Sequence, residues 1–299
     1  MKKAILIYNP TSGDHSIINK LDYIIGKFQD NDILIQPVRF YNYEETFLLN
    51  ILQESNSDYI VISGGDGTLN FIANVMLKNT INIPIGIIPS GTCNDFANSL
   101  GISSVIEECI DTIIEGKILD VDVGLLNDST YFLSTFAGGC FVDVSFSTNN
   151  ELKRNFGPLA YYLKGLQEVK NLRPYTLKIK TEDKVIQEKA FIFLILNGTQ
   201  GAGLSGLIGE ADITDGLMDI LIIKSCSHID LASLFFKVLS RDLTTDKNIT
   251  KLTAKSCTIE CDKKIPTSID GEKGSGLPIK VMFIGKALKI FTERTSDNI

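Results

Sequence analysis

The stretch VISGGDGTLN, residues 61–70, decides the fold of the N-terminal part of the chain. Its first residues are apolar and read as a buried strand, whereas Gly64, Gly65 and Gly67 surround a single acid, Asp66. The residues that follow, TLNFIANVML (68–77), have the apolar spacing of a helix. The stretch therefore predicts a strand, a tight turn and a helix, which is the building unit of parallel α/β sheets.

The same alternation of apolar runs and amphipathic stretches extends over the first ~120 residues. After residues 117–126, strand-like segments predominate, and only residues 158–170 and 228–240 read as helices. We therefore predict an α/β domain with a parallel sheet at residues 1–124 and a β-sandwich domain at residues 125–299, whose last few residues could return to the first domain. In the first domain we predict strands at 3–10, 32–40, 58–63 and 84–90, and helices at 14–29, 43–55 and 68–77.

Composition excludes several functional classes. The 6 cysteines form no CxxC pair and the 2 histidines, His15 and His228, lie far apart, which argues against a zinc site, a disulfide framework and a Ser-His-Asp triad. No basic stripe with interleaved aromatics indicates nucleic-acid binding. Neither a signal peptide nor an apolar span of about 18 residues is present, so we expect a cytoplasmic protein.

Glycine-rich stretches follow several predicted strands. They are YNPTSG (8–13), SGGDGTLN (63–70) and PSGTCNDFA (89–97) in the first domain, and SIDGE (268–272) in the second. Ligands bind at the carboxyl edge of open α/β sheets, where glycines let backbone N–H groups approach an anion and helix N-termini add positive potential. Any one stretch could be an ordinary strand–turn–helix junction, but three successive ones predict a phosphate cradle made from backbone.

Two familiar nucleotide motifs do not account for this pattern. No GxxxxGK[ST] sequence occurs, which excludes a P-loop. GAGLSG (201–206) satisfies GxGxxG, but turn residues and another strand follow it where a dinucleotide site needs a helix. We therefore reject a Rossmann site there.

In this order, NPTSG, SGGDGTLN and PSGTCNDFA resemble the soluble bacterial diacylglycerol kinases and their relatives, the sphingosine and ceramide kinases. GPLAYYLKGL, NGTQGAG, ADITDGLMDI and DGE extend the resemblance over nearly the whole chain. It implies an ATP- and Mg²⁺-dependent lipid kinase, most readily one that converts diacylglycerol to phosphatidic acid, with its active site in the interdomain cleft. An NAD or other small-molecule kinase sharing the GGDG domain, and a non-catalytic nucleotide or lipid sensor, are the alternatives.

The resemblance also implies roles for individual residues. Glu272 would be the catalytic base with Asp270 as its acidic neighbour, although Asp66 could equally be the base. A second, structural Mg²⁺ would be held by the Asp215 side chain and the backbone carbonyls of Asp212 and Leu217. Nucleotide, phosphates and Mg²⁺ would be held by Asn9, Pro10, Thr11, Ser12, Gly13, Gly64, Gly65, Asp66, Gly67, Thr68, Leu69, Asn70, Gly91, Thr92, Asn94 and Asp95.

Each of the three acids has an ordinary structural alternative. Asp66 could cap a helix that begins at Thr68, Glu272 could be an exposed hairpin acid, and Asp215 could belong to a plain DG turn. Asn98 stands where many relatives of the family carry a basic residue, a departure that would remove one phosphate contact.

A lipid substrate requires contact with a membrane surface, since no span is predicted. We expect peripheral association through basic residues that meet anionic headgroups, with about 1 kcal/mol for each residue near the surface. A homodimer through an exposed sheet edge is a further expectation. The candidate basic residues are Lys263, Lys264 and Lys273 in one group and Lys153, Arg154 and Lys164 in another.

Overall fold

The computed structural model describes residues 1–13, 16–40, 44–140, 142, 173–201, 204–205, 211–239 and 246–294. These residues form two compact units. The first unit consists of Met1–Val121 and Lys286–Ile299, and the second of Asp122–Gly285. The first unit is thus completed by a segment from the far end of the chain.

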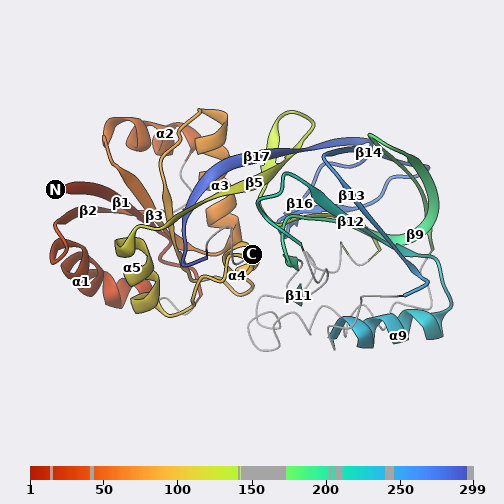
Figure 1. Cartoon of the computed structure of the whole chain (residues 1–299), viewed down its shortest axis with the longest axis horizontal. Coiled ribbons are helices and arrows are strands. Elements are labelled where there is room, and N and C mark those ends of the chain that lie inside the picture. The colour runs from red at the N-terminus through yellow and green to blue at the C-terminus, as the bar shows by residue number, and fades with distance from the viewer. Residues whose placement is uncertain are drawn as a thin grey trace. The chain divides into compact units, whose positions relative to one another are not determined.

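A parallel sheet forms the centre of the first unit (Figure 1). Its strands are β1 (Lys2–Tyr8), β2 (Ile33–Arg39), β3 (Tyr59–Gly64) and β4 (Ile85–Pro89), in the order β4-β3-β1-β2. Near the end of β17 (Ile279–Phe291), Ile290 pairs in parallel with Ile85 of β4 and so extends the sheet. All of β3 is buried, as expected for a central strand covered on both faces.

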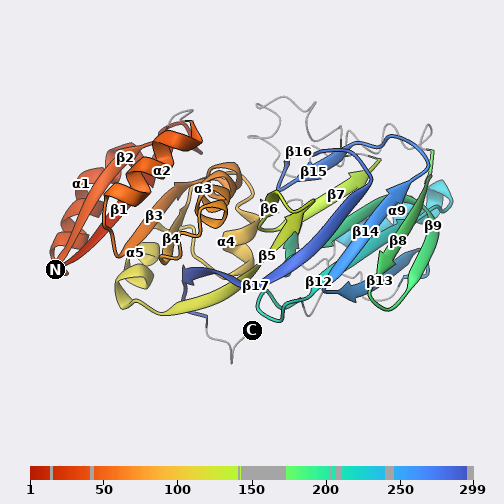
Figure 2. The ribbon, with the colours of Figure 1, turned by 90° about the horizontal axis from the view of Figure 1, so that it is seen from above.

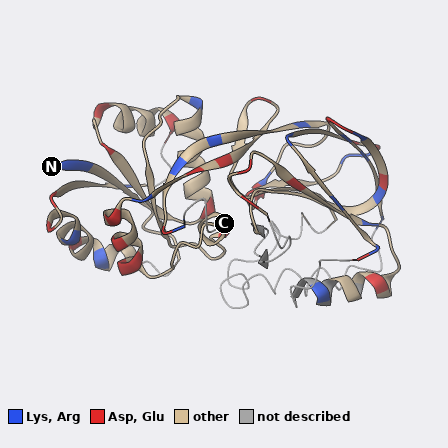
Figure 3. Cartoon of the chain, viewed as in Figure 1, with Lys and Arg blue, Asp and Glu red and all other residues tan. Residues whose placement is uncertain are grey.

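Helices cover both faces of this sheet, α2 and α3 on one and α1 and α5 on the other (Figure 1). Their bounds are Ser16–Gln29 for α1, Glu45–Glu54 for α2, Asp66–Lys78 for α3 and Ile106–Glu115 for α5, and the short α4 spans Asp95–Ser99. Val61 of β3 belongs to one buried cluster with Ile24 of α1 and Ile110 of α5. Acidic residues mark α5 in Figure 3, and one of them, Glu107, forms a 2.7 Å ion pair with Lys20 of α1.

Within the described part of residues 3–90, the structure confirms the predicted strands and helices, with boundaries that move by at most two residues. Helix α3 begins at Asp66 rather than at Thr68, and its N-cap is Gly65. Asp66 is therefore inside the first turn, and it does not act as the cap of a helix that starts at Thr68. Helix α5 was not among the predicted elements.

The second unit is built mainly from antiparallel strands, as predicted for a β-sandwich. The central strands run in the order β16-β15-β7-β9-β8-β14-β17, and β12 pairs with both β9 and β13. Strands β7, β15 and β16 lie beside one another in Figure 2. The bounds are Ile118–Leu126 for β5, Thr130–Phe132 for β6, Thr135–Gly139 for β7, Tyr175–Thr181 for β8, Val185–Leu196 for β9, Met218–Lys224 for β12, Ile249–Ala254 for β13, Ser256–Cys261 for β14, Thr267–Ile269 for β15 and Glu272–Lys273 for β16.

Aromatic side chains dominate the core of this unit. Phe132, Phe136 and Phe193 are fully buried in one cluster, and the Phe132 ring meets that of Phe283 edge-on at 5.8 Å. Such a packed antiparallel unit, together with the parallel first unit, confirms the predicted fold class.

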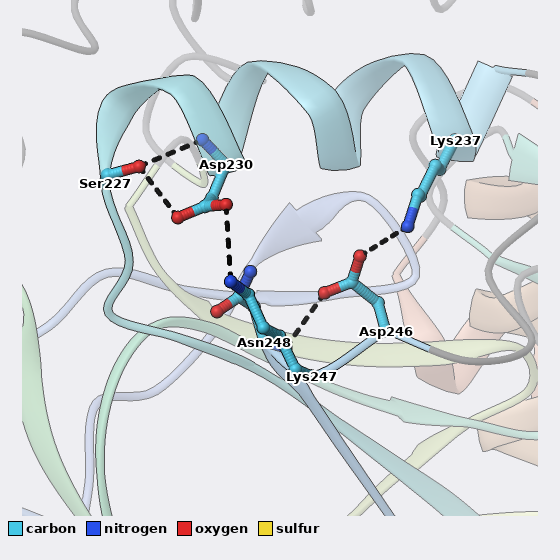
Figure 4. A network of polar contacts seen from close by, with 6 residues as sticks. All are labelled: Ser227, Asp230, Lys237, Asp246, Lys247 and Asn248. Carbon is cyan, nitrogen blue, oxygen red and sulfur yellow. Dashed lines mark hydrogen bonds and ion pairs between the residues drawn. The ribbon is translucent and has the colours of Figure 1, made fainter.

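Helix α9 (His228–Leu239) is the predicted helix of residues 228–240 and lies along β12 and β9 (Figure 1). Polar contacts stabilise both ends of this helix (Figure 4). At its start the Ser227 hydroxyl accepts the N–H of Asp230 and donates to the Asp230 carboxylate. At its end Lys237 forms a 2.7 Å ion pair with Asp246. Among the described helices, none is long and apolar enough to cross a membrane.

Candidate active site

Asn9, which directly follows β1, joins the first glycine-rich loop to β3 and α3 by hydrogen bonds. The backbone N–H of Asn9 donates to the carbonyl of Ser63 at 2.8 Å, and its side-chain Nδ2 donates to the hydroxyl of Thr68 at 3.1 Å. Its Oδ1 accepts both the N–H and the hydroxyl of Thr11. Asn9 thus connects the loop after β1 with the end of β3 and the first turn of α3.

Ser12 and Gly13 connect the same loop with the end of β4. The Ser12 hydroxyl donates to the carbonyl of Ser90 at 3.2 Å. Gly13 has φ +57°, and a Cβ at this position would lie 2.2 Å from the Ser90 oxygen. Only glycine is compatible with both the backbone conformation and this approach.

The loops after β3 and β4 touch through two glycines. An added Cβ on Gly65 would lie 3.0 Å from the Cα of Gly91, and one on Gly91 would lie 2.6 Å from the Cα of Gly65. Asp66 joins the same loops, because its Oδ2 accepts the backbone N–H of Asn94 at 2.8 Å. The Asn94 side chain in turn binds the N–H and the carbonyl of Gly91 at 2.9 and 3.0 Å. The three predicted loops therefore form one connected surface at the carboxyl edge of the sheet.

This surface is suited to an anion. Gly65 supplies no side-chain cap to α3, so the positive N-terminal end of a 13-residue helix faces the loops. The hydroxyl oxygens of Ser63 and Ser90, at the ends of β3 and β4, are buried without a hydrogen-bond partner among the described residues. Unpaired polar atoms and backbone N–H groups are the donors that a phosphate group requires.

The remaining predicted nucleotide residues differ in what they could contribute. The side chains of Pro10 and Leu69 are buried, so only their backbones could touch a ligand. Thr92 and Gly67 are exposed, and Asp95 is the first residue of α4. Asn70 accepts a bond from the amide of Asn74 at 3.1 Å. Asn98 donates from its side chain to the carbonyl of Cys93 at 2.7 Å, so it closes the loop after β4.

In the second unit, Asp270 and Glu272 lie on the hairpin of β15 and β16. Asp270 and Gly271 form its turn with φ +44° and +86°, the conformation that favours an Asp-Gly pair. Glu272 pairs with Ile269 in the hairpin and is exposed. The alternative, that Glu272 is an ordinary exposed hairpin acid, therefore agrees with its position, but a catalytic base must also be accessible to its substrate.

The Asp270 carboxylate accepts hydrogen bonds from the backbone of residues 133–135. It accepts the N–H groups of Leu133, Ser134 and Thr135 at 2.7, 2.9 and 2.8 Å. The N–H of Asp270 donates to the carbonyl of Thr135 at 2.8 Å. Three successive N–H groups on one carboxylate make Asp270 a structural anchor for the hairpin.

The predicted loop of the second Mg²⁺, residues 212–217, is folded around acidic side chains. Oδ1 of Asp212 accepts the N–H of Thr214, Oδ1 of Asp215 accepts that of Leu217, and Oδ2 of buried Asp122 accepts that of Gly216. Partial desolvation raises the pKa of Asp215, and the negative charges of Asp212 and Asp122 raise it further.

These residues fit a divalent cation, because an acidic carboxyl in a negative field with neighbouring carbonyl oxygens is the donor set that Mg²⁺ and Ca²⁺ prefer. Among the described residues no cluster of three His, Cys, Asp or Glu side chains could hold a metal. The predicted ligands include only one side chain, so they do not require such a cluster.

Sequence reasoning missed several residues that shape these loops. Asn74 holds Asn70, Asp122 holds the loop of residues 212–217, and Asn197 is a buried amide near the hairpin anchor. Asn74 lies within TLNFIANVML, Asp122 within residues 117–126 and Asn197 within NGTQGAG, but none of the three was predicted to be a site residue. Their short polar side chains look like ordinary turn or strand residues until their partners are known.

At GAGLSG the structure supports the rejection of a dinucleotide site. Gln200–Gly201 (β10) pairs antiparallel with Leu204–Ser205 (β11), so the described residues of this motif form strands where a dinucleotide site needs the start of a helix. Lys263, Lys264 and Lys273 are exposed. Lys153, Arg154 and Lys164, and the helix predicted at residues 158–170, lie outside the described residues.

Comparison with known proteins assigns the chain to a family. Residues 3–126 match the diacylglycerol kinase catalytic domain, and residues 139–292 match the YegS C-terminal NAD kinase beta sandwich-like domain. A diacylglycerol kinase from Staphylococcus saprophyticus is 31% identical over 99% of this chain and 97% of its own length. One from Staphylococcus carnosus is 30% identical with the same coverage.

A solved structure agrees with these matches. The crystal structure of a candidate diacylglycerol kinase from Bacillus anthracis str. Sterne is similar to the chain with a TM-score of 0.83 and 27% identity, covering 100% of this chain and 97% of that one. The relatives thus span both units and all the loops described above. The chain belongs to the diacylglycerol kinase family, and it is a kinase.

Proposed function

We propose that this kinase transfers the γ-phosphate of ATP to the hydroxyl of a membrane lipid, with diacylglycerol as the acceptor and phosphatidic acid as the product. The observation that carries the proposal is the meeting of three glycine-containing loops at one sheet edge, joined by Asn9, Ser12 and the Asp66–Asn94 bond. Such a set of backbone N–H groups suits the phosphates of a nucleoside triphosphate. Membership of the diacylglycerol kinase family supports a lipid as the acceptor.

Phosphoryl transfer to an alcohol depends on charge neutralisation and alignment more than on covalent chemistry. In the proposed reaction the N-terminal end of α3 and the loop amides bind the phosphates. The Asp66–Asn94 bond fixes the loop after β4 against α3, so that both loops keep their spacing while the nucleotide binds.

Mg²⁺ bound at Asp66 and Asp95 would supply positive charge to the phosphate oxygens. Both carboxylates are in the first turns of helices that start at the cradle, α3 and α4. A second ion held by Asp215 and the carbonyls of Asp212 and Leu217 would reduce repulsion within its acidic loop.

Glu272 is the proposed general base for the lipid hydroxyl. Its carboxylate would take the hydroxyl proton while the bond from the lipid oxygen to the γ-phosphorus forms and the bond to the β,γ-bridging oxygen breaks. The exposed position of Glu272 suits this task, because the acceptor is a large lipid presented at a membrane surface. Asp270 is engaged by three backbone N–H groups, which leaves Glu272 as the better placed acid of the pair.

The acceptor is delivered from a bilayer, and no described helix spans one. We propose that exposed basic residues of the second unit, Lys263 and Lys264 with Lys273, contact anionic headgroups. Stronger binding to anionic than to neutral vesicles, reduced when the three lysines are changed to glutamine, is the expected result.

Transfer of radiolabelled γ-phosphate to a panel of acceptors in mixed micelles tests the proposal. The panel contains diacylglycerol, monoacylglycerol, ceramide, sphingosine, undecaprenol and NAD, with Glu272→Ala and Asp66→Ala beside the wild type. Label in diacylglycerol that falls by at least about 10²-fold in both variants supports the proposal. Label in NAD alone would support an NAD kinase, the second candidate, which the NAD kinase-like description of the second domain favours.

A further inference from the structure

Asn197 is a buried amide that holds the strand segment against which the Glu272 hairpin is anchored. It follows the last residue of β9 and is 1% exposed. Both hydrogens of its Nδ2 are used, one on the carbonyl of Asp122 and one on the carbonyl of Leu133, each at 2.8 Å. Its backbone N–H donates to the carbonyl of Ser134 at 2.9 Å.

Two of the three residues that Asn197 binds, Leu133 and Ser134, also bind Asp270. Leu133, Ser134 and Thr135 direct their N–H groups to the Asp270 carboxylate, while the carbonyls of Leu133 and Ser134 accept from Asn197. The segment between β6 and β7 is therefore held from two sides by an amide and a carboxylate. Leu133 thus connects the Asn197 side chain directly with the Asp270 carboxylate.

Asp270 sets the position of Glu272 through the hairpin turn. Only Gly271 separates the two residues, and Ile269 pairs with Glu272 across the hairpin. The N–H of Asp270 is fixed by the carbonyl of Thr135, so both ends of this residue are attached to the segment that Asn197 supports. Glu272 itself is exposed, and the direction of its carboxylate depends on the backbone beneath it.

We infer that Asn197 is a positioning residue for the general base. Its side-chain amide holds the carbonyls of Asp122 and Leu133, and its backbone N–H holds that of Ser134. Residues 133–135 in turn hold Asp270, which orients Glu272. The inference rests on the proposed function for the role of Glu272. It concerns the second unit alone, since all of these residues lie within Asp122–Gly285. Asn197 makes no contact with the reacting atoms in this account.

The kinetic test uses Asn197→Ala, Glu272→Ala and the double variant. A displacement of about 1 Å at a reacting group costs about 10²-fold in rate, so Asn197→Ala is expected to lower kcat by about that factor with the KM for ATP within about twofold of the wild type. Because Asn197 acts through Glu272, the double variant should be no slower than Glu272→Ala alone. A double variant slower by the full factor of both single changes would overturn the inference.

Two further variants separate positioning from stability. Leu177→Ala is the control, because it removes a buried side chain of the same core. Leu177 pairs with Glu188 of β9, which lies nine positions before Asn197. At the rise of a strand, Leu177 is therefore roughly 30 Å from Asn197. Leu177→Ala should lower the unfolding temperature without the loss of kcat. Asn197→Asp keeps the shape but removes both donors, so a kcat like that of Asn197→Ala is expected, whereas wild-type kcat would overturn the inference. If Asn197→Ala does not fold, Asn197→Ser, which keeps one donor, is expected to lose about tenfold.

Hydrogen exchange gives a readout that does not depend on turnover. Amides of residues 133–135 and of 268–273 should exchange faster in Asn197→Ala than in Leu177→Ala at equal unfolding free energy. Equal protection in the two variants would overturn the inference and leave the proposed function untouched. The proposed function has a separate test. If the wild-type protein labels no acceptor, or if Glu272→Ala is fully active, the proposed function is overturned, and Glu272 is then not the group that Asn197 positions.

Discussion

Replacing Gly91 with alanine should disrupt nucleotide binding by forcing two loops apart. The added Cβ would lie 2.6 Å from the Cα of Gly65 and 2.7 Å from Oδ1 of Asn94. Carbon atoms in contact prefer about 3.5–4.0 Å, so the loops must separate by about 1 Å. Such a separation breaks the 2.9 Å bond from the Gly91 N–H to Asn94 and strains the Asp66–Asn94 bond of 2.8 Å.

The expected loss in affinity follows from the donors of the cradle. A hydrogen bond to a charged group contributes about 1.5–3 kcal/mol, so misplacing one loop amide should weaken ATP binding by about 10- to 100-fold. Overpacking at the site should in addition lower the free energy of unfolding by about 1–3 kcal/mol. Calorimetric titration with ATP measures the first effect, and chemical denaturation measures the second.

Gly26→Ala is the matched control for this substitution. Gly26 lies inside α1 in the same unit, and an added Cβ there meets no atom within 4 Å. Alanine is the better helix former, so this variant should gain about 0.5–1 kcal/mol of stability and bind ATP like the wild type. If Gly91→Ala also bound ATP within twofold of the wild type, the loops would not form the nucleotide site and the reasoning would be refuted.

Three further substitutions test the acidic groups. Asp215→Asn should unfold at a higher temperature than the wild type in the presence of a chelator and should lose the stabilisation that millimolar Mg²⁺ gives the wild type; an equal Mg²⁺ shift in both proteins would contradict the cation site. Because the pKa of Asp215 is raised in the folded state, the wild-type free energy of unfolding in chelator should fall, relative to that of the variant, as the pH rises from the ordinary carboxyl value through the raised one. Asp270→Asn replaces one acceptor oxygen by an NH₂ group that meets backbone donors and should cost about 1–3 kcal/mol in urea unfolding, whereas wild-type stability would show that the anchor is dispensable. At Asp246 the hydrogen bond from Lys237 lowers the pKa, so its stabilisation is present above the ordinary carboxyl value and is lost as the pH falls through the lowered pKa; the difference in unfolding temperature between wild type and Asp246→Asn should disappear in acid, and a difference independent of pH would contradict this.

The sequence by itself was sufficient for the order and type of β1 to β4 and of α1 to α3 in the first unit, but it did not predict α5. A short apolar run such as residues 58–63, rich in β-branched residues, favours a buried strand, and the glycines after it favour a tight turn. Local patterns of this kind also predict that the loops bind phosphate, because glycine and helix N-termini act on anions through the backbone alone. The DG turn before Glu272 was equally local, since positive φ favours these two residues.

Only the tertiary structure decided which partners the polar side chains have. Nothing in the local sequence indicates that Asp66 accepts from Asn94, that Gly65 touches Gly91, or that the far end of β17 completes the first sheet at Ile85. Asp270 reads as a free turn acid in sequence, yet it binds three amides 135–137 positions away. Long-range hydrogen bonds depend on where the chain returns in space, and the residues that make them, Asn197 above all, carry no local pattern that predicts the partner.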